Sequence, residues 1–215
     1  DVAPSRGLGD VYKRQVDIMM HTMERYFNHC DNMELTDGIS EHLLRTVMKN
    51  AKILMDEPQC YKARAEVMWA GSLSHNGLMA CGNDGGDWAC HQLEHELGGM
   101  FDVAHGAGLA AVWGSWARYV CDALPDRFEQ FAVNVMGVEN GDDKNAVIQK
   151  GIEAMENFFR QIEMPTDLGG LNIEVSEDQM KELALKCSHF GKRTIGCVKK
   201  LNQEDIYRIY QKAAD

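Results

Sequence analysis

Histidine and carboxylate side chains recur along this chain at spacings that could place them around a single ion or ligand. Asp17 and His21 are four positions apart, and so are His91 and His95. Residues four apart on an α-helix lie one turn from each other on the same face, so each pair would present two donor groups together. His105 follows ten residues after His95, and the chain would have to turn back for its ring to join them.

Together these residues would supply one carboxylate and up to four imidazoles. This donor set suits a borderline divalent cation such as Fe(II) or Zn(II) better than Ca(II) or Mg(II), which prefer oxygen ligands. With space for a substrate oxygen, the ion would act as a Lewis acid. Apolar residues such as Leu93 and Leu97 lie among the three later histidines, and burying three imidazoles in such surroundings is costly without polar partners. The cluster is therefore more consistent with a functional site than with packing.

Other interpretations of these residues remain open. A single histidine on a half-apolar helix is more often a packing residue than a ligand, and Asp17 with His21 could be an ordinary pair on a helix surface. The stretch from His91 to His95 also matches the H-x-x-E-H pattern of zinc peptidases, in which both histidines bind zinc and Glu94 would be the general base. A third possibility is a helical module without catalytic activity. The other histidines are interpreted as surface or packing residues: His29, His42, His75 and His189.

The elements that must position these residues are predicted to be helices. Apolar residues recur at intervals of three and four positions from Val16 onwards, and no stretch shows the sustained alternation of a half-buried strand. The predicted fold class is therefore all-α. Residues suited to begin helices are Thr36, Asp37 or Ser40, then Asp87, Pro125, Ser176 and Asn202. The predicted helices include 61–80, 88–99, 126–136, 143–162 and 203–213.

Two of these helices carry more specific predictions. The stretch from about Tyr61 to Ala80 is apolar on nearly all sides, so it is predicted to be the central helix of the domain. Gly98 and Gly99 are predicted to end the helix that carries His91.

Composition limits the classes of partner. The chain has 215 residues, 45% of them hydrophobic, which is enough for one sizeable core. A net charge of -11 argues against a nucleic-acid or anionic membrane surface, so a small molecule is the expected partner. No stretch has the length of a membrane span. Seven cysteines without a paired framework suit free thiols in a reducing cytoplasm.

Residues 1–15 differ from the rest of the chain because they combine a proline, two glycines and an excess of positive charge. We expect them to be an unstructured or non-native leader outside the fold. Residues 16–215 are then the predicted all-α metal-binding catalytic domain.

Three motifs give the chain from Val16 onwards a resemblance to a known family. They are Val16-Asp-Ile-Met-Met-His-Thr-Met-Glu-Arg-Tyr-Phe27, Ala63-Arg-Ala-x-x-Met-Trp-Ala70, and Asp87-Trp-Ala-x-His-x-Leu-x-His-Glu-Leu97 leading to His105-Gly106. In order, spacing and residue type they resemble the iron-containing (group III) alcohol dehydrogenases, in particular the NADPH-dependent butanol dehydrogenase and aldehyde reductase branch. The resemblance implies the multi-helix C-terminal half of these enzymes, with a dehydroquinate synthase-like fold.

The resemblance also implies roles for individual residues. Asp17, His21, His91 and His105 would bind the metal, usually Fe(II) and in some members Zn(II). His95 would not be a ligand but would lie near the nicotinamide and substrate, where it would relay protons. The metal would polarise the oxygen of a small alcohol or aldehyde while hydride passes to or from NADPH or NADH.

The chain departs from the family pattern at its N-terminal side. Members of the family begin with a nucleotide-binding α/β domain that contains a glycine-rich phosphate loop, and no such motif precedes Val16. We therefore expect that domain to be absent and the chain alone to lack turnover. The resemblance implies a homodimer for the full-length enzyme.

Overall fold

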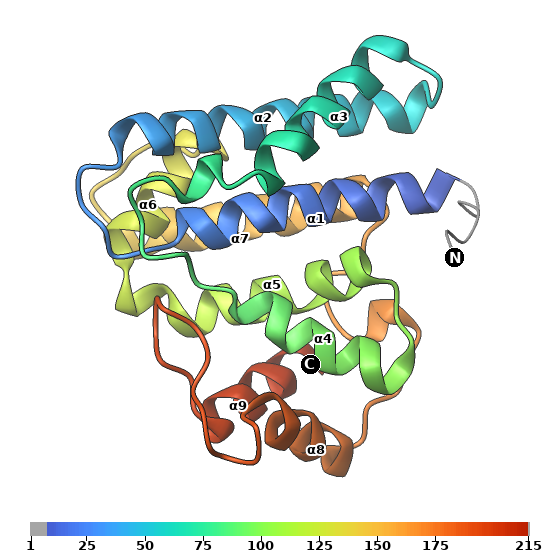
Figure 1. Cartoon of the computed structure of the whole chain (residues 1–215), viewed down its shortest axis with the longest axis vertical. Helices are drawn as coiled ribbons and strands as arrows, with labels where there is room; N and C mark the ends of the chain where they lie inside the picture. The colour runs from blue at the N-terminus through green and yellow to red at the C-terminus, as the bar shows by residue number, and fades with distance from the viewer. Residues whose placement is uncertain (1–7, 215) are drawn as a thin grey trace.

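The structure is a computed structural model that describes residues 8–214 (Figure 1). Within this range it contains nine α-helices and no named strand, which confirms the all-α prediction; the one isolated bridge joins Ile195 and Leu201. The α-helices are α1 (Leu8–Tyr26), α2 (Glu34–Asp56), α3 (Tyr61–His75), α4 (Ala89–Phe101), α5 (His105–Val120), α6 (Pro125–Asn134), α7 (Lys144–Gln161), α8 (Glu177–Cys187) and α9 (Gln203–Ala214). None of the helices in the described range is long and apolar enough to cross a membrane.

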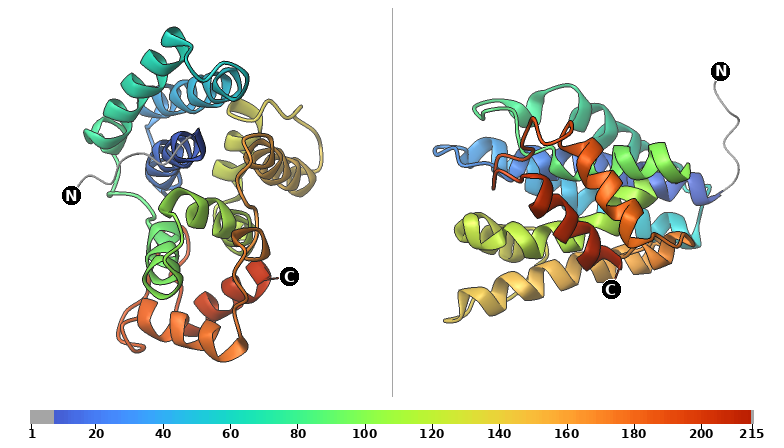
Figure 2. Two further views of the ribbon diagram at one scale, coloured as in Figure 1. Left: turned by 90° about the vertical axis from the view of Figure 1, so that its right-hand side faces the viewer. Right: turned by 90° about the horizontal axis from the view of Figure 1, so that it is seen from below.

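Helix α1 lies in the middle of the molecule. It packs against α2 and α3 on one side and against α4 and α5 on the other, and Figure 2 shows it end-on between these groups. Val16, Met19, Met20 and Met23 are fully buried because apolar residues occupy several faces of this helix. Since α1 also carries Asp17 and His21, the centre of the core and the start of the predicted site belong to the same element.

Helix α5 is the other central helix. Nearly all its residues are buried, including Trp113 and Trp116, and it packs against α1, α4, α7 and α9. Small residues make this possible: a Cβ atom on Gly106 would collide with the backbone oxygen of Lys13, so only glycine lets α5 approach α1 so closely.

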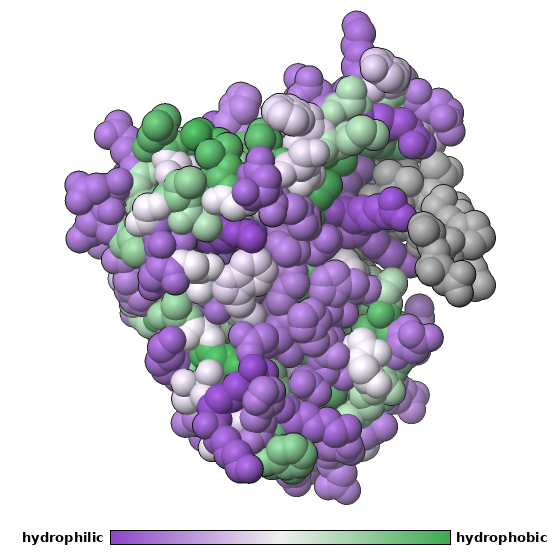
Figure 3. All heavy atoms as spheres, viewed as in Figure 1, coloured by the Kyte–Doolittle hydropathy of each residue, from purple (hydrophilic) through white to green (hydrophobic). Residues whose placement is uncertain are grey.

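The prediction that residues 61–80 form the central helix is wrong. Helix α3 ends at His75, a short 3-10 helix covers Leu78–Ala80, and Met68 and Trp69 are 73% and 63% exposed. Only small residues of α3, such as Ala63 and Ala70, are buried. Figure 3 shows hydrophobic side chains gathered over the α2 and α3 side of the molecule. Apolar composition alone therefore misplaced this helix, because it does not distinguish a core face from an exposed one.

Several helix boundaries also differ from prediction. Helix α1 begins at Leu8, so its first part is formed by residues 8–15, which were expected to belong to the leader. Residues 1–7 lie outside the described range. Helix α2 begins at Glu34, earlier than Thr36, Asp37 or Ser40, and the side chain of its cap residue Met33 makes no capping hydrogen bond. Asp37 lies in the first turn and pairs with Arg127. Helix α4 continues through Gly98 and Gly99 to Phe101.

Other predicted helix starts are confirmed. Pro125 is the first residue of α6, which suits its fixed φ and missing N–H. Ser176 and Gln179 form a reciprocal capping box before α8. Asn202 accepts hydrogen bonds from the backbone of Glu204 and Asp205 at the start of α9.

The packing of α6 on α7 gives a test of the fold. A Cβ atom on Gly151 would lie 2.8 Å from Cα of Ala132, and backbone cannot move aside easily. We expect Gly151→Ala to lower the free energy of unfolding by about 1–3 kcal/mol. Gly38→Ala is the matched control, because a Cβ there meets nothing within 4 Å, and it should raise stability by about 0.5–1 kcal/mol. Urea denaturation followed by circular dichroism measures both changes, and equal effects would contradict this packing.

Candidate metal centre

The four predicted metal ligands converge on one point in the structure. Asp17 and His21 lie one turn apart on α1, His91 lies in the first turn of α4, and His105 is the first residue of α5. The Oδ1 atom of Asp17 is 3.5 Å from Nε2 of His21, 3.5 Å from Nε2 of His91 and 3.4 Å from Nε2 of His105. Three helices thus bring three imidazole nitrogens to one carboxylate oxygen.

These residues fit a divalent cation. A tetrahedral ion with bonds of about 2.0–2.1 Å separates its donors by about 3.3–3.4 Å, close to the spacing from Asp17 Oδ1 to each ring. Among the described residues, Oδ1 of Asp17 and Nε2 of His91 are buried atoms without a hydrogen-bond partner. Buried polar atoms are normally satisfied. A cation bound between them would satisfy both.

Two buried glutamates pair with the Nδ1 atoms of two of the rings, on the side away from Asp17. Glu24, 1% exposed, pairs with Nδ1 of His91 and accepts a 3.1 Å hydrogen bond from the His91 backbone N–H. Glu94, 2% exposed, pairs with Nδ1 of His105. A carboxylate at Nδ1 fixes the ring orientation and leaves Nε2 available to bind a metal, an arrangement common in metalloproteins.

Local backbone features keep these groups in place. A Cβ atom on Gly108 would lie 2.7 Å from Cγ of Glu94, so this glycine leaves room for the glutamate between α4 and α5. Asp87 was predicted to cap α4; Trp88 occupies the cap position instead, without a side-chain cap. Asp87 nevertheless accepts hydrogen bonds from the backbone N–H groups of Ala89, Cys197 and Val198, and so ties the start of α4 to a distant loop.

The electrostatics of the cluster favour positive charge. Burial acts to raise the pKa of Asp17, but the imidazoles of His105 and His91 beside the carboxylate hold that pKa well below its usual range. Burial lowers the pKa of His21 to about 4, so this ring is neutral at pH 7. Burial also acts to lower the pKa of His91, yet Asp17 and Glu24 raise it to about 9. The nearby carboxylates of Asp17 and Glu94 raise the pKa of His105 to about 10. The carboxylates that stabilise protonated rings would also stabilise a bound cation.

His95 lies beside the cluster rather than inside it. Its side chain is exposed, and its ring stacks on that of His105 at 5.7 Å and lies 6.1 Å from that of His91. Asp17, His21 and His91 form one group of possible metal-binding donors within 4.8 Å of one another, and Glu94, His95 and His105 form another. Glu94 pairs with the ring of His105, a contact that the H-x-x-E-H peptidase interpretation does not include.

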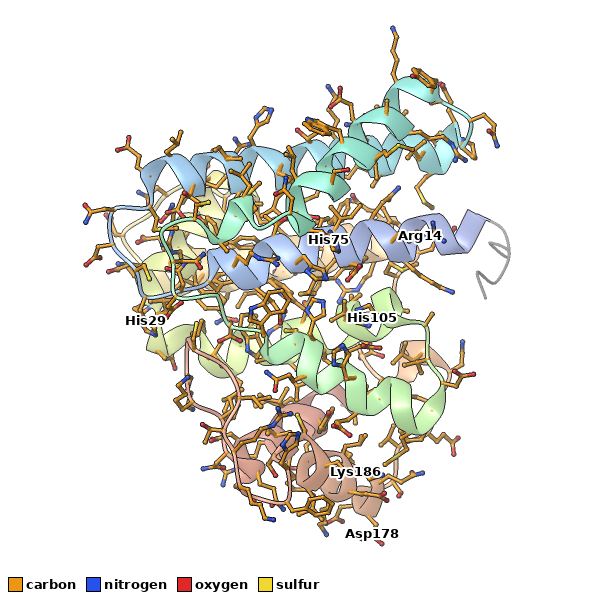
Figure 4. All side chains as sticks on the ribbon, in the orientation of Figure 1. Arg14, His29, His75, His105, Asp178 and Lys186 are labelled. Carbon is orange, nitrogen blue, oxygen red and sulfur yellow. The ribbon has the colours of Figure 1, made fainter. Side chains whose placement is uncertain are left out.

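Sequence reasoning missed three residues of the centre. Glu24 could have been found, because Asp17, His21 and Glu24 follow the spacing of one helical face. The ring of Trp88 lies 5.3 Å from that of His21 and 5.2 Å from that of His91, and its spacing in the sequence did not indicate this contact. His75, interpreted as a surface or packing residue, has its ring 4.0 Å from that of His21. Figure 4 shows His75 at the end of α3 and His105 at the start of α5, both beside α1.

Comparison with known proteins identifies the family. The family "Fe-containing alcohol dehydrogenase family, C-terminal" matches residues 13–214. The chain is 34% identical over 198 residues to NADH-dependent butanol dehydrogenase A of Clostridium acetobutylicum, covering 92% of this chain and 50% of that protein. It is 31% identical over 198 residues to the NADPH-dependent aldehyde reductase YqhD of Escherichia coli, again covering 92% and 50%. The chain therefore spans about half the length of these curated relatives.

Solved structures agree with this assignment. The crystal structure of NADH-dependent butanol dehydrogenase A from Thermotoga maritima superposes with a TM-score of 0.89 at 32% identity, covering 98% of this chain and 54% of that one. The substrate- and cofactor-free form of YqhD from Escherichia coli gives a TM-score of 0.89 at 29% identity, covering 99% and 54%. The chain belongs to the Fe-containing alcohol dehydrogenase family and corresponds to its C-terminal, all-α domain.

Proposed function

We propose that this chain is the metal-bearing domain of an NAD(P)-dependent alcohol dehydrogenase or aldehyde reductase. The observation that carries the proposal is the convergence of His21, His91 and His105 on Oδ1 of Asp17, at 3.4–3.5 Å. These four residues would hold Fe(II) or Zn(II), which supplies a Lewis acid for an alcohol or aldehyde oxygen when bound.

The residues around the four ligands would orient the rings and carry protons. Glu24 and Glu94 hold the rings of His91 and His105 through Nδ1 and keep both Nε2 atoms directed at Asp17. His95 occupies the exposed side next to His105. From there it would touch the nicotinamide and substrate and carry a proton between the substrate oxygen and solvent.

Other properties of the enzyme would depend on the part of the protein beyond this chain. Relatives of which this chain matches about half are named as NADH-dependent and NADPH-dependent enzymes, so either nucleotide is in keeping with the family. We propose that the nucleotide is bound mainly by an N-terminal α/β domain and that the full-length enzyme is a homodimer. All seven cysteines are free thiols, which supports a reducing compartment such as the cytoplasm.

Metal retention tests the proposed ligand set. Asp17→Asn and His105→Ala should each reduce bound metal to well below one ion per chain, because a donor is lost. His95→Ala should retain the metal, because its ring is not among the four ligands. Elemental analysis after gel filtration of the purified variants measures this. A chain that loses its metal on His95→Ala and keeps it on His105→Ala would instead support the peptidase interpretation.

The role of the buried glutamates gives a second test. We expect Glu24→Gln to weaken Zn(II) binding by about 10–100-fold, because the neutral amide supports the His91 ring less well. Glu153→Gln is the matched control, since Glu153 is exposed on α7. Competition with a chromophoric chelator measures both affinities. If both variants bind Zn(II) like the unchanged chain, Glu24 has no such role.

An activity assay tests whether catalysis needs a second, nucleotide-binding domain. We expect the metal-loaded chain to show no measurable reduction of butyraldehyde by NADPH, because residues that hold the nucleotide would lie elsewhere in the full-length protein. Steady-state loss of NADPH absorbance is the measurement. Full activity of this chain would overturn the proposal that a second domain is needed.

A further inference from the structure

His75 is the residue near the metal centre that neither its sequence context nor the four-ligand set accounts for. It is the last residue of α3, and its side chain is 43% exposed. Its Nε2 atom lies 3.6 Å from Oδ2 of Asp17. Oδ1 of Asp17 faces the other three imidazoles, so Asp17 has a histidine nitrogen facing each of its two oxygens.

The end of α3 is fixed against α1, which holds His75 at this position. Nη1 of Arg25 donates hydrogen bonds to the backbone oxygens of His21, at 2.8 Å, and of Ser74, at 3.1 Å. Ser74 is fully buried. A Cβ atom on Gly71 would lie 3.1 Å from Cδ1 of Ile18, so α3 approaches α1 closely one turn earlier as well.

The hydrogen bonds of the His75 ring determine which of its two nitrogens carries the proton and which has a free lone pair. Nδ1 of His75 lies 3.0 Å from the backbone oxygen of Gly71 and 2.7 Å from Oγ of Ser74. Ser74 Oγ donates its own proton to the oxygen of Gly71. Both neighbours therefore accept from Nδ1, which carries the proton in the neutral ring. Nε2 is then an acceptor.

An acceptor nitrogen facing a carboxylate oxygen is unfavourable unless a proton, a water molecule or a metal cation lies between them, and a cation held by Asp17 would serve both atoms. The separation of 3.6 Å is too long for a hydrogen bond. The other three rings lie at a similar distance, 3.4–3.5 Å, from the second oxygen of the same carboxylate, Oδ1. Imidazole nitrogen is also a preferred donor for Fe(II) and Zn(II).

We propose that His75 is a fifth protein donor of the metal centre, binding the ion through Nε2. The inference rests on the proposed function, because it requires the centre formed by Asp17 and its three histidines to hold an ion. It adds a ligand from α3 and expands the tetrahedral set of four donors to five, so that the centre would join α1, α3, α4 and α5.

Metal affinity and spectroscopy of the purified 215-residue chain test this assignment. We expect His75→Ala to weaken Zn(II) binding about tenfold or more in competition with a chromophoric chelator. In the Co(II)-loaded chain the same change should alter the position and intensity of the visible d–d bands, because one nitrogen donor is lost. His42→Ala is the matched control: His42 is an exposed histidine of α2 and should leave affinity and spectrum unchanged.

Each outcome decides between the two proposals. If His75→Ala matches the unchanged chain in both affinity and spectrum while Asp17→Asn loses the metal, only the role of His75 is overturned. If the unchanged chain binds neither Zn(II) nor Co(II), the proposed function fails and the role of His75 fails with it.

A measurement without any substitution covers the case in which His75→Ala does not fold, as judged by circular dichroism. In the unchanged chain, addition of Zn(II) should shift the Nε2 nitrogen resonance of His75 as it shifts that of His21. A His75 resonance that stays in place while that of His21 moves would overturn the assignment.

Discussion

Three imidazole nitrogens from three helices face one oxygen of Asp17, and the packing of α1, α4 and α5 must hold them there. Each ring could rotate away unless its position is fixed, and the buried carboxylates of Glu24 and Glu94 fix two of them. Burying these acids is costly unless they are paired. The rings of His91 and His105 are therefore both the partners of the glutamates and the proposed donors of the centre.

The glycines of α5 follow from the same constraint. His105 reaches Asp17 only because α5 starts against the backbone of α1, and Gly106 permits that approach. Gly108 leaves space for Glu94 behind the His105 ring. On the α4 side, Asp87 anchors the turn before His91 to the loop at residues 196–198. Helix packing and the geometry of the centre thus depend on each other residue by residue.

Much of this arrangement was predictable from local spacing. The four-residue interval placed Asp17 and His21 on one face, and capping and proline signals predicted the starts of α6, α8 and α9. Spacing alone did not separate His91 from His95, and the return of His105 depended on the family resemblance. His75 left no local signal, because its contact with Asp17 depends on how α3 packs on α1. The exposed apolar residues of α3 misled the prediction of the core.

The donors of the centre come from parts of the chain that are far apart, from α1 to the start of α5. An unfolded chain does not hold them together, so an ion that binds them binds the native state almost exclusively. Free ion at one hundred times its dissociation constant would add about 2.7 kcal/mol to the free energy of unfolding. The supply of metal in the cell would then govern how long the protein resists proteolysis, and so its abundance as well as its chemistry.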